Sequence, residues 1–447
     1  MVIILLLLGA ASLRVLFSMD PFLHPWDERY HALVAKNLMN HSLMPTLYDS
    51  PVLHFDYKVW TDNHVWLHKQ PLSLWLIAGS YKVFGVSALA TRIPSILLTT
   101  LATYGTYRIG YRLFSSRIGY YAALLFTING LILDNASGRT ATDHIDAVYL
   151  SFITLAIWAA LEYAHSRKFW INLFCGVLIG CAVLTKWLPA LIVGLLWLIA
   201  TRAKGHSTKS TLLNGLVLIA TIIAVALPWQ LHINANFPQE ATWESHLNFV
   251  HLFEAVEGRE GGFFFHWEEI RIHFGELIYL PLLFLGWISF KKGNWHYWFL
   301  FIWFIIPMIF FSFVATKMPS YILFTCPALF INVALCARWI KRHHTKGKFK
   351  FPAYLVLILL IVLPLRLTIE RSKVFDKLHH QQEWHSEIME FIESNKLTDR
   401  SIVYNTEHPI ELMFESECVA YSKNIDEAAK DSLRQKGYVL IDYSKYD

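Results

Sequence analysis

The chain has 447 residues, of which 55% are hydrophobic, 15% are aromatic and only 16% are charged. This composition indicates a multi-pass membrane protein and argues against an ordinary soluble domain, which carries more charge and less apolar surface. The net charge of +5 does not indicate a nucleic-acid-binding protein, because an excess of Lys and Arg is expected in the cytoplasmic loops of membrane proteins.

Apolar runs long enough to cross about 30 Å of hydrocarbon recur from the N-terminus to residue 369. The first run lacks a basic n-region and a small-residue cleavage site, so we interpret it as a retained helix. The expected fold class is an all-α polytopic membrane protein over residues 1–369. About eleven transmembrane helices are predicted, at 1–18, 90–113, 117–134, 146–165, 168–186, 188–202, 210–229, 275–290, 296–314, 320–339 and 351–369.

The loops between these spans predict the orientation. If the N-terminus is cytoplasmic, the inner loops contain YRLFSSR, HSRKF, RAKGHSTK, KKGN and RWIKRHHTKGKFK, which are basic and nearly free of acidic residues. This arrangement satisfies the positive-inside rule at each loop. The apolar stretch at 71–85 is short and contains Lys82, and counting it as a span would invert every later loop. We therefore predict an interfacial helix on the outer face there.

With this orientation, three long segments face outward: 19–89, 230–274 and 370–447. In the last segment, the strand-like stretches SIVYN, CVAYS and GYVLIDY alternate with the helix-like stretches EWHSEIMEFIES and NIDEAAKDSLRQ. The sequence therefore predicts a small extracytoplasmic α/β domain at 370–447, following the transmembrane domain at 1–369.

Ionisable residues are almost absent from the middles of the predicted spans. A charge at the bilayer centre costs roughly 2.5–3.5 kcal/mol on insertion scales, so the position of each charge is informative. By residue count, Lys186 and Lys317 reach the outer boundary, and Pro189 favours a helix break just after the first of them. An ion-coupled transporter would be expected to place such groups near the midplane. Charges at the outer boundary suit a lipid-anchored substrate whose headgroup lies outside.

Several segments follow one another in a characteristic order: WDERYHALVAKNL, HKQPLSLWL, FGVSALATRIPS, GRTATDHIDAVYLSFITLA, GCAVLTKWLP, WESHLNFVHLFEAVEGREGGFFFHWEEI and TKMPSYILFTCPAL. This series resembles the GT-C glycosyltransferases of the protein O-mannosyltransferase and aminoarabinose-transferase type, which use polyprenyl-phosphate sugars as donors. The likeness extends from about Asp27 to about Leu329. One departure is Gln70, which replaces the first proline of that family's K-P-P segment.

The resemblance implies a role for individual residues. Asp27 would be the catalytic base, Glu28 would support it, and Asp146 would be the second acidic position, with Asp143 as a close competitor. The groups expected to hold the lipid phosphate are Lys69, Lys186, Lys317 and Tyr321, with Arg92 as an additional cation. Two further residues of the possible site are His246, which matches an outer-loop histidine, and Arg259.

Glycosyl transfer from a lipid phosphate requires a base for the acceptor proton, cations for the leaving phosphate and the exclusion of water. We expect an inverting reaction without a covalent intermediate. Structural alternatives stay open at this stage. Asp27 is also a suitable N-cap for an amphipathic helix, and Asp146 is a suitable cap for the fourth span. The lysines would also suit snorkelling helix ends.

The function expected from these observations is sugar transfer from an undecaprenyl-phosphate-like donor to a protein, lipid A or glycan acceptor. The reaction would take place on the periplasmic (extracytoplasmic) face of the cell inner membrane, among membrane lipids and without nucleic acid. The alternatives are a transporter or flippase of a lipid-linked sugar, and another lipid-sugar polymerase or ligase. The outer histidines suggest a possible divalent metal such as Zn²⁺, Mg²⁺ or Mn²⁺, but no HExxH spacing occurs, and satisfied loop histidines are the default.

Overall fold

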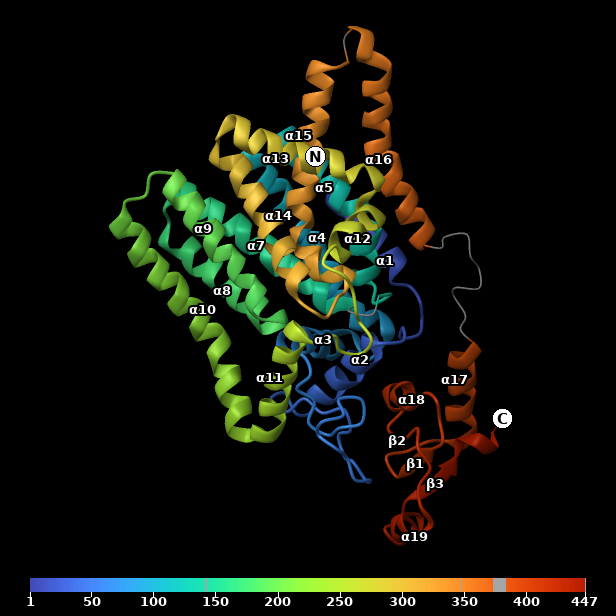
Figure 1. The fold of residues 1–447 in the computed structure, drawn as a ribbon. Helices are drawn as coiled ribbons and strands as arrows, with labels where there is room; N and C mark the ends of the chain where they lie inside the picture. The colour runs from blue at the N-terminus through green and yellow to red at the C-terminus, as the bar shows by residue number, and fades with distance from the viewer. Residues whose placement is uncertain (141–142, 346, 373–382, 447) are drawn as a thin grey trace.

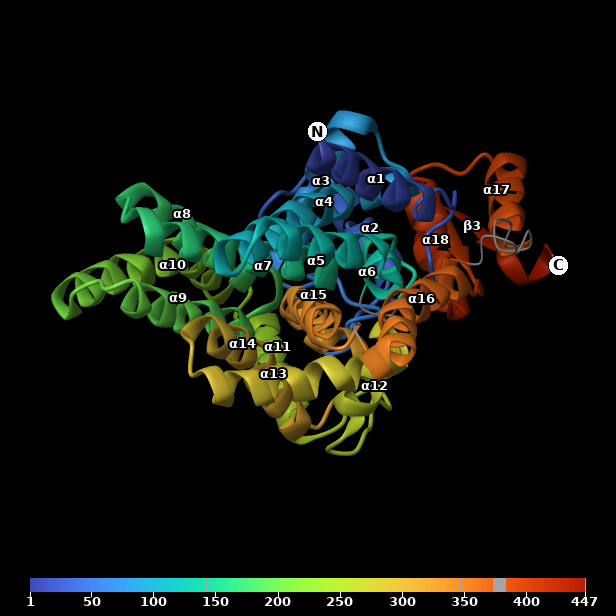
Figure 2. The same cartoon turned by 90° about the horizontal axis from the view of Figure 1, so that it is seen from above.

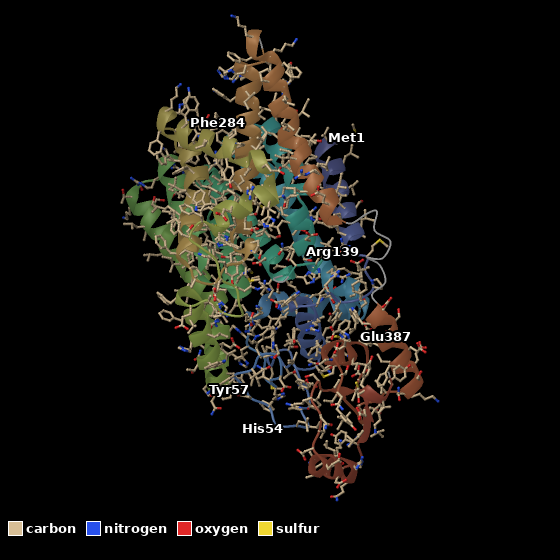
Figure 3. All side chains as sticks on the ribbon, turned by 45° about the vertical axis from the view of Figure 1, so that its right-hand side comes forward. Met1, His54, Tyr57, Arg139, Phe284 and Glu387 are labelled. Atoms are coloured by element: carbon tan, nitrogen blue, oxygen red, sulfur yellow. The ribbon has the colours of Figure 1, made fainter. Side chains whose placement is uncertain are left out.

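The computed structural model describes residues 1–140, 143–345, 347–372 and 383–446 (Figure 1). A bundle of long helices forms the upper part of the view, and a layer of short helices and loops lies beneath it. We call this layer the outer layer, and the end of the bundle that it covers the outer end, after the side predicted from the sequence. In Figure 3, Met1 and Phe284 lie toward one end of the molecule, whereas His54 and Tyr57 lie toward the other. The bundle therefore separates the N-terminus from the outer layer.

Among the described residues, six helices are long and apolar enough to cross a membrane, and three further candidates are helix pairs bent by more than 40°. The six are α7 (Asp143–Ser166), α8 (Phe169–Lys186), α10 (Thr208–Asn236), α14 (Trp295–Phe313), η3 with α15 (Pro319–Thr325 and Cys326–His343) and η4 with α16 (Gly347–Phe349 and Lys350–Ser372). The bent pairs are α3 (Pro71–Phe84) with α4 (Ala88–Leu113), α5 (Ser116–Ile128) with α6 (Gly130–Ala136), and α12 (Phe265–Phe274) with η2 and α13 (Glu276–Ile278 and Tyr279–Lys292).

Two shorter apolar helical segments complete the set: α1 (Val2–Phe17), and η1 with α9 (Leu188–Leu191 and Ile192–Ala203). Each predicted span coincides with one of these helices or helical pairs. The prediction of a polytopic helical membrane fold is therefore confirmed. Viewed from above, α5 and α7 lie centrally, α8–α10 lie on one side, and α12–α14 lie along another (Figure 2).

The stretch predicted as an interfacial helix forms α3, which does not continue into the next span. Pro71 occupies the first turn of α3, where its missing N–H is not needed, and Gly85 ends the helix with φ +82°. The Ser87 side chain then caps α4, whose axis turns by 119° from that of α3. This bend agrees with an interfacial position for α3 at the outer end of the bundle.

The outer layer also contains α2 (Asp27–Leu38), which lies beside α3, and α11 (Pro238–Phe253), which follows the long helix α10. The segment between α2 and α3 is mostly irregular, with one isolated bridge between Thr46 and Val65. These outer elements bring together the parts of the chain in which the sequence predicted the site.

The C-terminal segment folds around a three-stranded parallel sheet in the order β2-β1-β3. The predicted strands and helices of this segment are confirmed, whereas the short helix α18, which packs on α2, was not predicted. The elements are α17 (Glu383–Asn395), β1 (Ser401–Tyr404), α18 (Pro409–Glu415), β2 (Val419–Ala420), α19 (Glu427–Gln435), β3 (Val439–Asp442) and η6 (Tyr443–Lys445).

Candidate active site

Asp27 and Lys69 meet where the N-terminal ends of α2 and α3 come together. The Lys69 Nζ lies 3.3 Å from the Asp27 Oδ2, and both side chains are partly exposed, at 27% and 17%. Asp27 is the first residue of α2, and the N-cap position belongs to Trp26. The alternative in which Asp27 serves as an N-cap is therefore wrong, and its carboxylate is directed to a cation instead.

The electrostatic environment keeps Asp27 ionised. Burial raises the pKa of the Asp27 carboxyl, but the charge of Lys69 and the smaller contributions of His31 and His68 outweigh burial and place it below its ordinary value. An ionised carboxylate beside an ammonium group is available to accept a proton at neutral pH.

Aromatic and acidic side chains surround His68, the residue before Lys69. The His68 ring stacks on Trp60 with centroids 4.6 Å apart and planes within 5° of parallel. Its Nδ1 lies 3.4 Å from the Glu244 Oε2, and the Trp60 Nε1 donates a hydrogen bond of 2.8 Å to the Glu257 Oε1. Burial and the nearby Lys69 charge lower the pKa of His68, against the opposing effect of Glu244. The imidazole is therefore neutral near pH 7.

Glu28 has an entirely different environment from its neighbour. Its side chain is 0% exposed, and Arg92 donates to it through Nε (2.8 Å) and Nη2 (3.1 Å). His24 Nδ1 lies 2.7 Å from one carboxylate oxygen, and His144 Nε2 lies 3.1 Å from the other. A Cβ at Gly138, whose φ is +76°, would collide with this carboxylate. We call this set the Glu28 network; its remaining members are Asp20 and Arg139, which pair at 2.8 Å.

Arg92 is saturated by this network. Besides Glu28, it donates to the backbone carbonyl oxygens of Ser18, Asp20 and Phe22, and its side chain is 0% exposed. The predicted role of Arg92 in holding the donor phosphate is therefore not supported, because its donors are already used. Its contacts instead fix the chain that enters α2, which is consistent with the separate supporting role expected for Glu28.

A second acid–base pair lies deeper, at the outer ends of α7 and α8. Lys186 forms an ion pair with Asp146, which is 2% exposed, and its ammonium lies 4.6 Å from the centroid of the Tyr321 ring. Asp146 lies inside the first turn of α7, which begins at Asp143, so the alternative in which Asp146 caps the helix is wrong. The Tyr321 ring thus lies against the second pair.

Lys317 lies in the turn between α14 and η3, as its residue count predicts, but its side chain contacts the protein backbone. Its ammonium donates to the carbonyl oxygens of Phe311 (2.8 Å) and Ser312 (2.7 Å) in the last turn of α14, and the residue is 4% exposed. Burial lowers the pKa of this lysine. A cation at a helix C-terminus satisfies carbonyl groups that have no partner within the helix. Lys317 therefore ends α14, and its predicted contact with a phosphate is not supported.

The three additional candidates have different positions. The Arg259 guanidinium lies over the Trp26 ring, 5.3 Å from its centroid, and so lies beside the start of α2. His246 is exposed on α11, whereas Glu244 on the same helix is 6% exposed and is the residue that approaches His68. The Asp143 side chain lies outside the described residues.

Among the described residues, no group of three or more His, Cys, Asp or Glu side chains is arranged to hold a metal ion.

Sequence reasoning missed the pairing of His68 with Glu244 and the stacking of Trp60. A partial signal existed, because His68 precedes Lys69 within the HKQP segment that carried the resemblance. The geometry as a whole combines an ionised carboxylate, a neighbouring ammonium, a phenol and aromatic walls at the outer end of a membrane bundle. Such a set suits proton abstraction from an acceptor next to a departing anion.

The comparisons with known proteins agree with this arrangement. Residues 68–229 match the family model described as dolichyl-phosphate-mannose-protein mannosyltransferase. An undecaprenyl phosphate-alpha-4-amino-4-deoxy-L-arabinose arabinosyl transferase of Pseudomonas fluorescens is 30% identical over 56% of this chain and 43% of its own length. A transferase of the same name from Pseudomonas aeruginosa is 28% identical over 59% of this chain and 49% of its own. The matched segment thus spans about half the length of these relatives.

Solved structures resemble the chain over nearly its whole length. ArnT from Cupriavidus metallidurans, bound to undecaprenyl phosphate, superposes with a TM-score of 0.65 at 15% identity, covering 99% of this chain and 90% of the other. The Archaeoglobus fulgidus oligosaccharyltransferase gives a TM-score of 0.59 at 13% identity, covering 98% and 69%. The chain therefore has the fold of the GT-C glycosyltransferases, and its resemblance to their protein O-mannosyltransferase and aminoarabinose-transferase type is confirmed.

Proposed function

We propose that this protein transfers a sugar from a polyprenyl-phosphate donor to an acceptor on the extracytoplasmic face of the inner membrane, with inversion at the anomeric carbon. The observation that carries the proposal is the pair formed by Asp27 and Lys69, 3.3 Å apart at the outer end of the bundle. It joins a base for the acceptor to a cation for the leaving phosphate.

In the proposed reaction, Asp27 accepts the proton of an acceptor hydroxyl or amine as that group attacks the anomeric carbon. The bond from this carbon to the phosphate oxygen breaks, and its electron pair leaves with the phosphate. Lys69 and the Tyr321 hydroxyl would stabilise the developing negative charge. Trp60, which stacks on His68, and the fully buried Trp66 would reduce the access of water to the reacting groups.

The donor is proposed to be an undecaprenyl-phosphate sugar, since the curated relatives are named for undecaprenyl phosphate 4-amino-4-deoxy-L-arabinose and one solved relative binds undecaprenyl phosphate. The family model is named for mannose, a hexose, so a pentosyl and a hexosyl donor are both candidates. Lipid A, protein and glycan acceptors are proposed as candidates because each offers a hydroxyl or amine outside the membrane.

The proposal is tested by incubating purified protein with a panel of undecaprenyl-phosphate pentoses and hexoses, each with a protein, lipid A or glycan acceptor, and analysing the products by mass spectrometry. We expect one donor–acceptor pair to give a product whose mass increases by one glycosyl unit, with free undecaprenyl phosphate as coproduct. Asp27→Asn serves as the inactive control. Vectorial movement of the intact donor across a vesicle membrane, with no covalent product, would support a flippase instead.

A further inference from the structure

The C-terminal domain, described here over residues 383–446, contacts α2 on the face of the helix opposite to Asp27. Lys36, in the last turn of α2, donates three hydrogen bonds to the carbonyl oxygens of Met413 (3.0 Å), Phe414 (3.2 Å) and Ser416 (2.7 Å). These carbonyls belong to the C-terminal end of α18. This end carries the partial negative charge of the helix dipole, and its carbonyl groups lack partners within the helix. Lys36 therefore joins the end of one helix to the end of another.

A second contact fixes the other end of the same helix face. Arg29 Nη1 lies 2.8 Å from the Glu411 Oε1, and Glu411 is 4% exposed. Arg29 and Lys36 are seven residues apart, which places them on one face about 10 Å from each other along the axis. Asp27 lies about 200° around the helix from Arg29. The helix thus presents its base to the site and its two cations to the C-terminal domain.

The domain reaches the site by a second route. Tyr421, just after β2, stacks on Tyr48 with centroids 5.0 Å apart, and its hydroxyl accepts hydrogen bonds from the backbone N–H groups of Val52 (3.1 Å) and Leu53 (3.3 Å). The same loop continues to Trp60, which stacks on His68. Asp27, through α2, and His68, through this loop, are therefore both connected to the C-terminal domain.

One continuous apolar core accompanies these polar contacts. Buried residues of α2 and α3, including Leu33 and Leu74, belong to the same hydrophobic cluster as Ile402, Leu412 and Phe414 of the C-terminal domain. Removing the whole domain would expose this core to water and would obscure any specific effect. Single substitutions at the polar contacts are the sharper test.

We propose that the C-terminal domain is a brace that positions Asp27 through α2 and His68 through the loop containing Tyr48 and Trp60. The proposal rests on the proposed function, because its consequence is a faster chemical step. Displacing a reacting group by about 1 Å can cost on the order of a hundredfold in rate, so a domain that does not touch substrate can still set the turnover rate. Lys36 and Tyr421 are its positioning residues.

The test measures kcat and the donor KM of the full-length protein carrying Lys36→Met, which keeps the length of the stem and removes the ammonium. We expect kcat to fall about tenfold through misplacement of the base, with the donor KM within about twofold and acceptor preference unchanged. Lys36→Arg keeps a cation and should restore most of the loss. The matched control is Arg434→Met, because Arg434 pairs with Asp431 on α19 (3.2 Å).

Hydrogen exchange of the α2 amides gives a readout that does not depend on activity. We expect faster exchange across residues 27–38 in Lys36→Met and unchanged exchange in Arg434→Met. If Lys36→Met does not fold, Tyr421→Phe replaces it, because this change keeps the stacked ring and removes the acceptor of two backbone N–H groups. For Tyr421→Phe we expect a lower kcat, an unchanged donor KM and faster exchange of the Val52 and Leu53 amides.

The outcomes are distinguishable. Wild-type kcat together with wild-type exchange in Lys36→Met, or in Tyr421→Phe where it is the replacement, would overturn the brace. A raised acceptor KM with unchanged kcat would also overturn it, since that result identifies an acceptor-recognition domain. If the wild-type protein makes no product with any donor, the proposed function fails. In that case, the exchange data still decide whether the domain holds α2.

Discussion

Asp27 and Glu28 are adjacent in the sequence, and both pair with a cation, but they differ in exposure and in the groups around them. The Asp27 side chain is 17% exposed and faces Lys69, whereas the Glu28 side chain is 0% exposed and lies between Arg92, His24 and His144. Successive residues of an α-helix point about 100° apart, so one carboxylate meets the outer site and the other enters the bundle. Two neighbouring acids therefore form one candidate base and one structural anchor.

The largest expected effect follows from Asp27→Asn, which keeps the shape of the side chain and removes its basicity. Loss of a general base typically lowers kcat about 10²–10⁴-fold, and we expect a loss in that range with little change in thermal unfolding. The measurement is the initial rate with the donor identified by mass spectrometry, together with donor binding. Full activity in this variant would remove Asp27 as the base.

Glu28→Gln should have the opposite signature, a loss of stability. Breaking a buried ion pair by removing one partner typically costs about 3–5 kcal/mol, because Arg92 is left buried without its counter-charge. We expect a lower unfolding temperature in detergent and near-normal turnover per folded molecule. Normal stability with lost turnover would make Glu28 a participant in the chemistry and would remove the contrast between the two acids.

The Glu28 network also predicts how stability depends on pH. Burial raises the pKa of Glu28, but the charges of Arg92 and His24 and the hydrogen bond with His144 outweigh burial and hold it well below the ordinary 4.5. Its stabilising contribution is therefore present above pH 4.5 and is lost as the pH falls toward the folded-state value. Unfolding measured between pH 3 and 7 should show this loss in the wild type and a weaker one in Glu28→Gln; parallel curves would contradict the prediction.

The pH dependence of kcat tests the other half of the contrast, the assignment of Asp27 as the base. The Lys69 charge helps to hold the pKa of Asp27 below its ordinary value of 3.8, and His68 is neutral near pH 7 because its pKa is lowered. Asp27 therefore stays ionised from pH 8 to pH 5, and we expect protonation of the base to cause no acid limb of kcat in this range. Single-turnover rates across this range test the expectation, and an acid limb near pH 6 to 7 would assign the essential base to another group.

Sequence patterns were sufficient for the fold because spans and strands are set by local features. The apolar runs predicted the membrane helices, and the strand-like stretches SIVYN, CVAYS and GYVLIDY predicted β1, β2 and β3. Asp27 and Lys69 could also be predicted as site residues, because each belongs to a segment that carries the family resemblance. The resemblance implied that Lys317 holds the lipid phosphate, with Arg92 as an additional cation, and neither assignment could take account of the partners that these side chains have in the folded protein.

Their true partners depend on tertiary packing. Arg92 reaches Glu28 across 64 positions of the chain, and this pairing has no periodicity that a sequence would reveal. Lys317 turns back onto the carbonyl groups of α14, a choice that depends on where that helix ends. The α18 contact with Lys36 joins segments 377 to 380 residues apart. Buried polar pairing was thus the part of the site that required the structure.

The smallest expected effect concerns α11, where the same helical geometry separates two neighbours. His246 and Glu244 are two residues apart and therefore point about 200° from each other, so only Glu244 approaches His68. Because exposed substitutions usually change free energies by less than about 0.5 kcal/mol, His246→Ala should keep kcat within about twofold of wild type. Glu244→Gln removes the negative charge beside His68 and should have the larger effect in the same assay. Reversal of this order would mean that α11 turns its other face to the substrate when the donor binds.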